Sequence, residues 1–488
     1  MTFVFYDTET TGLRIGFDQI VQFAAIKTDN DLNELDRFEV RSRLLPHIVP
    51  HPQAMLTNGL GIDKLVDEGL PTHYQMVVDL RRRLIEWSSA IFVGYNSMGF
   101  DEEMLRHALF QTVHPAYLTN TNHNCRADAM GLALSAAALA PGALAVPSKP
   151  DGRPSFRLAE LAVANGIAVG QSHDAMADAE ATLGLSRLIK QAAPDVWQRF
   201  VRFSKKATVA EFVDAEDGFV FTEFFSNEAY HQPVVALGPD PEIKTRRLCL
   251  RLDIDLDALA QMSDAEQQAV FSQKPNPMRT LKVNAAPTLT SLFDASEAML
   301  GDVSFDIYED RARRLKEDAP LVARLLSNYG VTRRLFDPPE VPEQRIHVGP
   351  PAWQDENRMA SFHEVSWPDA ARLVAEMDHD GLRTFAARVI YCEARAHLPE
   401  ALRLAVEREL TDRLVVPTGY GFTLQQAIDS IDTMMDVSDD AHGILPGYRA
   451  YLVERQQKVL AYRSKLFAFD AVSEGGNYAS RHSHDGEP

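Results

Sequence analysis

The sequence predicts an α/β domain, followed by a small β-barrel and then by an α-helical region. Over roughly the first 190 residues, short β-prone apolar runs alternate with stretches of helical periodicity, which is typical of α/β domains. Residues 207–290 instead hold short β-prone runs separated by frequent turns, which favours a small barrel. From about Ser304 the apolar residues recur at helical spacing. A chain of 488 residues is long enough for two or three such domains.

The first domain is expected to contain four strands and several helices. The strands are predicted near 2–7, 20–28, 37–45 and 90–96, and helices over 73–87, 101–110 and 175–189. The proline-rich stretch 141–154 is expected to be a loop at the rim of the site.

The second and third domains are predicted from shorter patterns. The β-prone runs of the barrel lie at 208–213, 219–225, 234–237, 248–253 and 280–283, with an inserted helix over 256–271. Prolines within 337–351 indicate a semi-rigid connector. Helices are then expected at 366–377, 381–396, 399–411, 423–434 and 446–469. The expected domains are 1–193, 194–340 and 341–472, with a disordered tail at 473–488.

An acidic pair follows the first predicted strand, in the block FYDTETTGL (5–13). Residues two apart on a strand point to the same face, so Asp7 and Glu9 should project together while Thr8 points away. Paired carboxylate oxygens suit Mg²⁺ or Mn²⁺ rather than a soft metal. For this block alone, an acidic turn at a strand end is the alternative.

A third acidic residue, Asp101, follows the strand near 90–96 in the block GYNSMGFDEE (94–103) and opens the next predicted helix. Taken alone, Asp101 could be only the N-cap of that helix. Asn96 in the same block could be only a turn residue.

The block SHDAMADAEAT (172–182) adds a histidine and a further acid. His173 and Asp178 would lie about 140° apart around a helix, so they cannot share one face. If both reach one site, His173 must precede the helix, where a partly exposed imidazole suits a general base. A surface-loop histidine is the alternative. Asp174 is a rival ligand, which we interpret as the helix cap.

These blocks, in this order and in these strand and helix contexts, resemble the DEDDh exonucleases. The shared pattern is D-x-E, then N-x3-F-D, then H-x4-D, and it covers roughly the first 190 residues. The resemblance implies a ribonuclease-H-like fold for this domain. Longer segments are similar to bacterial exonuclease I, a single-strand-specific deoxyribonuclease. They are 21–29, 94–110, 154–183 and, far downstream, EQRIHVGPPAWQDENRM (343–359). This second resemblance implies that the barrel is Src-homology-3-like.

The resemblance implies a 3′→5′ exodeoxyribonuclease that degrades single-stranded DNA to 5′-mononucleotides with two Mg²⁺ ions, which Mn²⁺ can replace. Asp7, Glu9 and Asp178 would hold the ion that binds the attacking water, with Asp7 bridging to the second ion. Asp101 would help through bound waters, and His173 would accept the proton of the attacking water. The expected substrate contacts are Thr10, Thr11, Asn96 and Arg157.

The sequence contains a local cluster of basic residues, although the net charge of the whole chain is −20. Arg202, Lys205 and Lys206 alternate with Phe200 and Phe203, just after the first domain. Solvated charges on a helix face are the ordinary interpretation, but the resemblance favours a track for the DNA backbone.

Two functional alternatives stay open at this level. A 3′→5′ exoribonuclease could use the same site, because the motifs do not distinguish DNA from RNA. A non-catalytic single-strand-binding scaffold would be expected to lack one of the five DEDDh residues, and all five are present.

Composition sets the cellular context that we expect. Cys125, Cys249 and Cys392 are far apart, which indicates free thiols, and we expect a cytoplasmic protein without a membrane span. The resemblance adds the expectation of a monomer with a role in DNA repair. The resemblance also implies docking of the acidic tail of the single-stranded-DNA-binding protein. Residues 127–143, which would contribute to that surface, contain no Lys or Arg, which argues against docking there.

Overall fold

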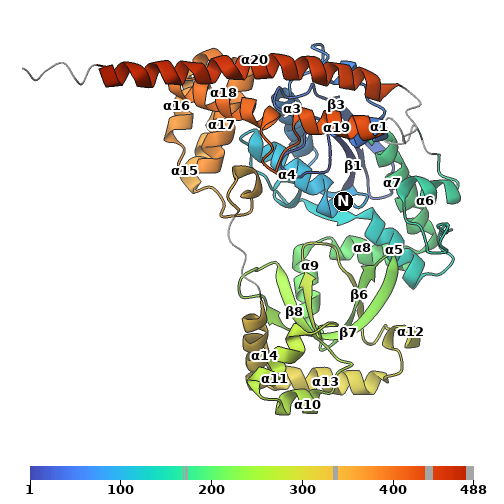
Figure 1. Ribbon diagram of the computed structural model, residues 1–488. Helices are drawn as coiled ribbons and strands as arrows, with labels where there is room; N and C mark the ends of the chain where they lie inside the picture. The colour runs from blue at the N-terminus through green and yellow to red at the C-terminus, as the bar shows by residue number, and fades with distance from the viewer. Residues whose placement is uncertain (169, 171–173, 334–338, 435–442, 480–488) are drawn as a thin grey trace, which may run out of the picture.

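The computed structural model describes residues 1–168, 170, 174–333, 339–434 and 443–479, with side chains as far as residue 467. The first domain is built on a five-stranded sheet in the order β3–β2–β1–β4–β5 (Figure 1). The central strand β1 (Thr2–Thr10) is antiparallel to β2 (Ile20–Thr28) and parallel to β4 (Ala90–Gly94). At the edges, β3 (Glu34–Arg41) is antiparallel to β2, and β5 (Cys125–Asp128) is parallel to β4.

The four predicted strands of this sheet are confirmed, and β5 is an addition. The sequence does not predict β5 because Arg126 and Asp128 leave no apolar run in its four residues. Strand β1 extends past the end of β4, since the pairing of these two strands stops at Phe5 and Val93. The residues of β1 beyond Phe5 therefore have one open edge, and the acidic pair lies there.

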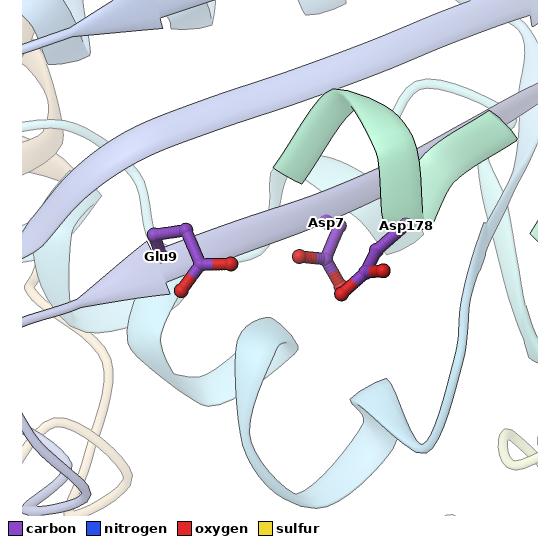
Figure 2. Close-up of side chains that lie close together, drawn as sticks. All are labelled: Asp7, Glu9 and Asp178. Carbon is purple, nitrogen blue, oxygen red and sulfur yellow. The ribbon is translucent and has the colours of Figure 1, made fainter. Parts of the chain in front are cut away.

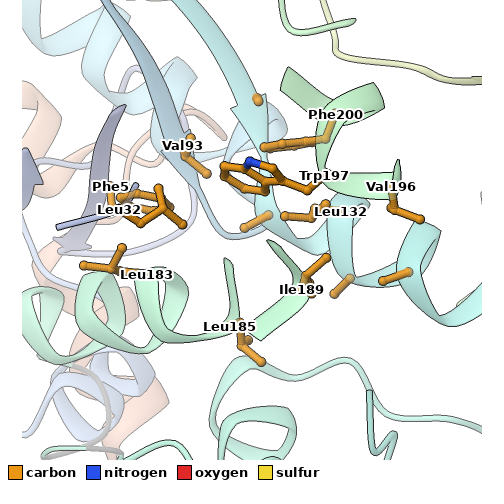
Figure 3. Packing of buried hydrophobic residues seen from close by; sticks show 14 of the residues in the cluster. Phe5, Leu32, Val93, Leu132, Leu183, Leu185, Ile189, Val196, Trp197 and Phe200 are labelled. Carbon is orange, nitrogen blue, oxygen red and sulfur yellow. The ribbon is translucent and has the colours of Figure 1, made fainter. Parts of the chain in front are cut away.

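Helices cover both faces of the sheet. Helices α5 (Ala129–Leu139) and α7 (Ala175–Ala192) lie on the face of Phe5 and Val93 (Figure 3). Helices α3 (His73–Glu86) and α4 (Asp101–Gln111) lie on the opposite face. Because both faces are covered, the buried part of β1 is a continuous apolar run rather than an alternating one. Three short helices complete the domain: α1 (Pro52–Asn58), α2 (Ile62–Leu65) and α6 (Leu158–Ala164).

A second, antiparallel sheet of five strands forms the lower body in Figure 1, in the order β10–β6–β7–β8–β9. Apolar side chains are buried on both of its faces. This observation confirms an antiparallel β-rich domain, while its closure into a barrel stays a prediction. The strands are β6 (Phe219–Phe225), β7 (Glu228–Pro239), β8 (Arg246–Arg251), β9 (Met278–Lys282) and β10 (Thr288–Ser291).

Two local predictions in this region are wrong. Residues 208–213, which we expected to be β-like, belong to helix α9 (Lys206–Ala215), which buries Val209, Phe212 and Val213 on one face at helical spacing. The helix expected over 256–271 is two helices, α10 (Leu256–Gln261) and α11 (Asp264–Ser272). Ser263 separates them by capping α11 in a capping box with Glu266.

The predicted domain boundaries remain predictions, although two observations bear on them. Helix α8 (Pro194–Phe203) packs into the core of the first domain through Trp197 and Phe200, so that core extends past residue 193. Helix α20 (Ile444–Ala479) extends into the expected tail, and residues 480–488 lie outside the part that the structure describes.

The remaining helices confirm the helical character of the chain beyond the second sheet. They are α12 (Glu297–Leu300), α13 (Phe305–Glu317), α14 (Ala319–Thr332), α15 (Trp353–Phe362), α16 (Trp367–Glu376), α17 (Asp380–Ala394), α18 (Glu400–Val415) and α19 (Leu424–Met434), followed by α20. Helices α15–α20 pack on the first domain; for example, the Tyr448 hydroxyl donates to the Pro50 carbonyl at 2.7 Å. None of the helices that the structure describes is long and apolar enough to cross a bilayer.

Candidate metal-binding active site

Three carboxylates that are far apart in the sequence converge at the open end of β1 (Figure 2). One oxygen each from Asp7, Glu9 and Asp178 lies within 4.8 Å of the other two. Asp7 and Glu9 share a face because alternate residues of a strand point the same way. Asp178 comes from the first turn of α7, which packs across that face. The structure thus brings together three of the four predicted metal ligands.

The electrostatics of this group favour a bound cation. Burial, together with the charges of Asp101, Asp178 and Glu9, raises the pKa of Asp7 well above its usual value. Burial and neighbouring carboxylates also raise the pKa of Glu9 to about 8. A divalent ion would relieve the repulsion among these three carboxylates. Because hard ions prefer oxygen ligands, the group is a suitable site for Mg²⁺ or Mn²⁺.

Asp101 lies beside this group but outside the tight set of three. It is the first residue of α4, and Phe100 occupies the N-cap position, so the N-cap alternative for Asp101 is wrong. Its Oδ1 accepts a hydrogen bond of 2.5 Å from the hydroxyl of Thr8. Burial raises the pKa of Asp101 to about 6, and the Thr8 hydrogen bond opposes that rise. Because Thr8 stands between Asp7 and Glu9 in β1, this hydrogen bond brings Asp101 near both residues, and its charge contributes to their raised pKa values.

Asp174 caps helix α7 and is not a rival ligand. Its Oδ1 accepts from the backbone N–H groups of Met176 and Ala177, and its Oδ2 accepts from Gln22 and Arg41. The helix-cap interpretation is therefore confirmed. His173 lies outside the described residues, so its role as general base stays a prediction.

The structure argues against a direct substrate contact by Thr11. Its hydroxyl donates to Asp18 and accepts from the backbone of Gln19, and its own N–H donates to the Gln19 carbonyl. Thr11 is 2% exposed, so it holds the turn after β1 in place, which corrects our expectation. Thr10 is buried as well, and its hydroxyl donates to the carbonyl of Gly12 at 2.8 Å. A nucleotide could therefore reach only the acceptor side of the Thr10 hydroxyl.

Asn96 and Arg157 are exposed and stay predictions. Asn96 adopts a left-handed backbone conformation, which confirms its turn, and its N–H donates to Asp128 at 2.8 Å. Its side chain is therefore presented to solvent from a fixed backbone. Arg157 is 78% exposed, with only a peripheral ion pair to Glu160 at 3.4 Å.

The basic cluster lies away from the carboxylates. Burial raises the pKa of the Cys125 thiol, and the nearby charge of Lys205 opposes that rise. Cys125 begins β5 and is level with Ile91 of β4 and Phe3 of β1, at the amino ends of these parallel strands, whereas Asp7 and Glu9 lie toward the carboxyl end of β1. Phe200 and Phe203 are buried in two apolar cores, so their rings are not available to stack on bases.

Leu13, three residues after the end of β1, is a further exposed residue that no sequence motif indicated, and it is 81% exposed. A single apolar residue between Gly12 and Arg14 in a predicted polar turn was the available signal. The C-terminal helical region holds this turn in place. The Arg14 guanidinium donates to the Gly421 carbonyl at 2.6 Å, and the rings of Phe17 and Tyr420 stack with their centroids 5.6 Å apart. Leu13 is thus an exposed apolar side chain in a turn that the C-terminal helical region holds in place.

Parts of the chain are similar to known proteins. Residues 4–185 match the exonuclease family RNase_T. Exodeoxyribonuclease I of Escherichia coli is 27% identical over 305 residues, which are 59% of this chain and 63% of that protein. The Haemophilus influenzae enzyme is 30% identical over 215 residues, which are 44% of this chain and 45% of that protein. The matched regions thus span between 45% and 63% of the length of these two relatives.

Solved structures extend the likeness to nearly the whole chain. Exonuclease I from Methylocaldum szegediense superposes with a TM-score of 0.80 at 21% identity, covering 93% of this chain and 99% of that one. E. coli exonuclease I in complex with a dA16 oligonucleotide gives a TM-score of 0.79 at 20% identity, covering 94% and 99%. Residues 4–185 therefore resemble the exonuclease family RNase_T in sequence, and the chain as a whole has the fold of bacterial exonuclease I.

Proposed function

We propose that this protein is a 3′→5′ exodeoxyribonuclease that degrades single-stranded DNA to 5′-mononucleotides. The observation that carries the proposal is the convergence of Asp7, Glu9 and Asp178, with Asp101 beside them, in an exonuclease domain. Four neighbouring carboxylates repel one another and so destabilise a metal-free site, which argues against a purely structural role. The same arrangement suits metal-dependent hydrolysis of a phosphodiester bond.

The metal requirement follows from the donor set. Asp7, Glu9 and Asp178 would hold one divalent ion, and Asp7 together with Asp101 would serve a second, with Mg²⁺ the expected ion and Mn²⁺ a substitute. When bound, the two ions would supply the charge that stabilises the attacking and leaving oxygens of an in-line displacement. A structural neighbour, the E. coli exonuclease I complex with single-stranded DNA, is known in a zinc-bound form, which supports a divalent-metal site.

The remaining chemistry belongs to side chains of this protein. His173 would accept the proton of the attacking water, because it precedes the helix that carries Asp178 and imidazole titrates near neutral pH. Leu13 offers an apolar surface next to the site, and the Thr10 hydroxyl can still accept one hydrogen bond. Together they would place the 3′-terminal nucleotide against the carboxylates.

Single-stranded DNA is the substrate that the relatives favour. Solved neighbours include E. coli exonuclease I with dA16 and with dT13 oligonucleotides. Arg202, Lys205 and Lys206 would contact the backbone of a longer strand, and Asn96 and Arg157 would contact it near the site. An exoribonuclease is the alternative outcome of the test below.

The finer features of the fold and of the cellular context belong to the same proposal. The second domain would be a Src-homology-3-like barrel within 194–340, followed by a helical domain within 341–472. The protein would act as a cytoplasmic monomer in DNA repair. Docking of the acidic tail of the single-stranded-DNA-binding protein would have to use a surface other than 127–143, which contains no Lys or Arg.

One assay tests the proposal. The protein is incubated with 5′-labelled single-stranded DNA, the same sequence as RNA, and duplex DNA, each with Mg²⁺ and with chelator. We expect stepwise shortening of the single-stranded DNA from its 3′ end, only with metal, and no cleavage by Asp7→Ala, which should still bind the strand. Preferential shortening of RNA would establish the alternative, and cleavage in chelator or by Asp7→Ala would overturn the proposed site.

A further inference from the structure

At the open end of β1, alternate residues have two different roles, according to the face of the strand on which they lie. The odd residues of β1 at its open end, Asp7 and Glu9, point to the metal-binding group. The even residues beside them, Tyr6 and Thr8, point to the opposite face, as alternation in a strand requires. There they contact two consecutive residues at the start of α4. The Thr8 hydroxyl donates to Asp101 at 2.5 Å, and the Tyr6 hydroxyl donates to its neighbour, Glu102, at 3.2 Å.

Glu102 is the most enclosed residue of the first turn of α4, with an exposed fraction of 0%. Besides the Tyr6 hydroxyl, its carboxylate accepts from the Thr119 hydroxyl at 2.5 Å and pairs with Arg126 of β5 at 3.0 Å. Arg106, one turn along α4, lies 3.0 Å from the same oxygen. Glu102 thus joins the start of α4 to β1, to β5 and to the segment that holds Thr119. A buried carboxylate with this many donors fixes the backbone that carries it.

The turn that leads into α4 is fixed as well. Asp128, at the end of β5, accepts hydrogen bonds from the N–H groups of Asn96 at 2.8 Å and Met98 at 3.3 Å. Asp101 is therefore held from both sides, by the turn before it and by Glu102 after it. With the backbone of Asp101 fixed, its side chain can still rotate, and the hydrogen bond from Thr8 fixes the orientation of the carboxylate.

We propose that Thr8 and Glu102 are positioning residues that place the Asp101 carboxylate for a second metal ion. Glu102 fixes the backbone at the start of α4. Thr8 donates a hydrogen bond to Oδ1 of Asp101, which holds the carboxylate in one orientation. The other oxygen, Oδ2, would then bind the ion or a water molecule of its coordination shell. The proposal rests on the two-metal function proposed above. The Thr8 hydroxyl binds Asp101, and the Glu102 carboxylate binds Tyr6, Thr119 and Arg126, so the two side chains should act mainly on the ion that depends on Asp101.

Thr8→Val tests this directly, because valine has the same shape and lacks the hydroxyl. Mn²⁺ binding is measured by titration calorimetry and by the electron paramagnetic resonance signal of free Mn²⁺, in the metal-free full-length chain. We expect the parent to bind two ions and Thr8→Val to bind one of them about 10–100-fold more weakly, the usual effect of removing a group that orients a metal ligand. Thr8→Ser should restore parental binding, and the melting temperature should stay close to that of the parent.

Two further variants separate positioning from general damage. Thr112→Val removes another buried hydroxyl of the same region, which donates to the Ala108 carbonyl at 2.7 Å, and should bind Mn²⁺ as the parent does. Glu102→Gln should weaken the same single ion as Thr8→Val, and raising Mn²⁺ should recover part of its DNA cleavage. Parental Mn²⁺ binding by Thr8→Val, or an equal loss in Thr112→Val, would overturn this inference alone. A parent that binds no Mn²⁺ would overturn the proposed function and this inference together.

Discussion

Arg41 on β3 forms an ion pair with Asp174, the residue that caps helix α7, with Arg41 Nη2 2.8 Å from Asp174 Oδ2. The other oxygen of Asp174 accepts from the first backbone N–H groups of α7. An edge strand of the sheet thus holds the start of the helix that carries Asp178. This arrangement fixes Asp178 relative to Asp7 and Glu9, which lie on the central strand of the same sheet.

Asp174→Ala should therefore impair the enzyme through the helix rather than through a lost ligand. We expect the free energy of unfolding to fall by about 1 kcal/mol, the usual effect of losing an N-cap. Cleavage should slow because the first turn, which carries Asp178, loses its anchor. Asp174→Asn keeps a capping oxygen and loses only a partly exposed ion pair, worth about 0–1 kcal/mol, so it should keep most of the activity. If Asp174→Asn is as inactive as Asp178→Asn, Asp174 is a metal ligand and the cap interpretation is wrong.

The raised pKa of Glu9 predicts how the metal-free protein responds to pH. The folded protein keeps the Glu9 proton up to a pKa of about 8, whereas the ordinary pKa of this group is 4.5. Between these values the folded state binds more protons than the unfolded state, so the Glu9 contribution to the free energy of unfolding falls as pH rises. A shift of this size limits the effect to about 4–5 kcal/mol.

Urea unfolding in chelator at pH 5, 6.5 and 8 tests this expectation, with Glu9→Gln as the matched variant. The free energy of unfolding of the parent should decline relative to that of Glu9→Gln as pH rises. Mg²⁺ should reverse the decline in the parent, because the ion replaces the proton, and should do so less in the variant. Parallel pH curves for the two proteins would show that Glu9 is not perturbed in this way.

His173→Ala should slow the chemical step by about 10²–10⁴-fold, as expected for loss of a general base. The parental rate should rise with pH through one apparent pKa near that of imidazole, because only the neutral ring accepts a proton. The rising limb should disappear in the variant. The measurement is single-turnover cleavage across pH 5–9 at saturating Mg²⁺, with Mn²⁺ binding as a control for the metal site. An unchanged pH profile in His173→Ala would assign the base to another group.

Features that depend on local backbone pattern could be predicted from the sequence, whereas side-chain contacts between distant residues could not. Asp7 and Glu9 could be placed together because strand periodicity is local, and Asp174 could be read as a cap because it directly precedes the helix. The Thr8–Asp101 hydrogen bond joins residues 93 positions apart, and no local pattern encodes it. The resemblance led us to expect Thr11 to contact substrate, and no local pattern indicated that its hydroxyl binds Asp18 and the backbone of Gln19 across a turn.

The wrong strand at 208–213 has a different cause. The segment is rich in residues that favour strands, but Val209, Phe212 and Val213 recur at helical spacing, and the helix buries all three in one core. Burial of a complete apolar face outweighs intrinsic preference, which differs by only about 1 kcal/mol between residues. The unpredicted strand β5 forms because β4 offers it a paired edge, which is a tertiary effect.

The basic cluster gives the last prediction. Arg202, Lys205 and Lys206 are exposed, and no ion pair of theirs occurs among the residues that the structure describes. The Arg202 guanidinium lies over the rings of Phe203 and Phe212, 5.3 and 5.6 Å from their centroids, so the aromatics hold this charge at the surface. Because the charge of Lys205 acts on Cys125, at the amino ends of the parallel strands, and the carboxylates lie toward the carboxyl end of β1, we expect only a DNA strand several nucleotides long to contact both places.

Changing all three residues to Glu should weaken binding of long single strands and shorten the run of nucleotides removed per encounter. Each lost phosphate contact should reduce the log–log salt dependence of binding by about 0.7. Cleavage of a very short oligonucleotide should change far less, because it reaches only the metal site. The control reverses three other exposed charges that pair within their own helices, Arg313, Arg372 and Lys458, and therefore changes the net charge equally. If the control variant weakens binding of long strands as much as the cluster variant does, the change in net charge explains the weaker binding. If the cluster variant loses activity equally on long and short substrates, these residues support the fold and the track interpretation is wrong.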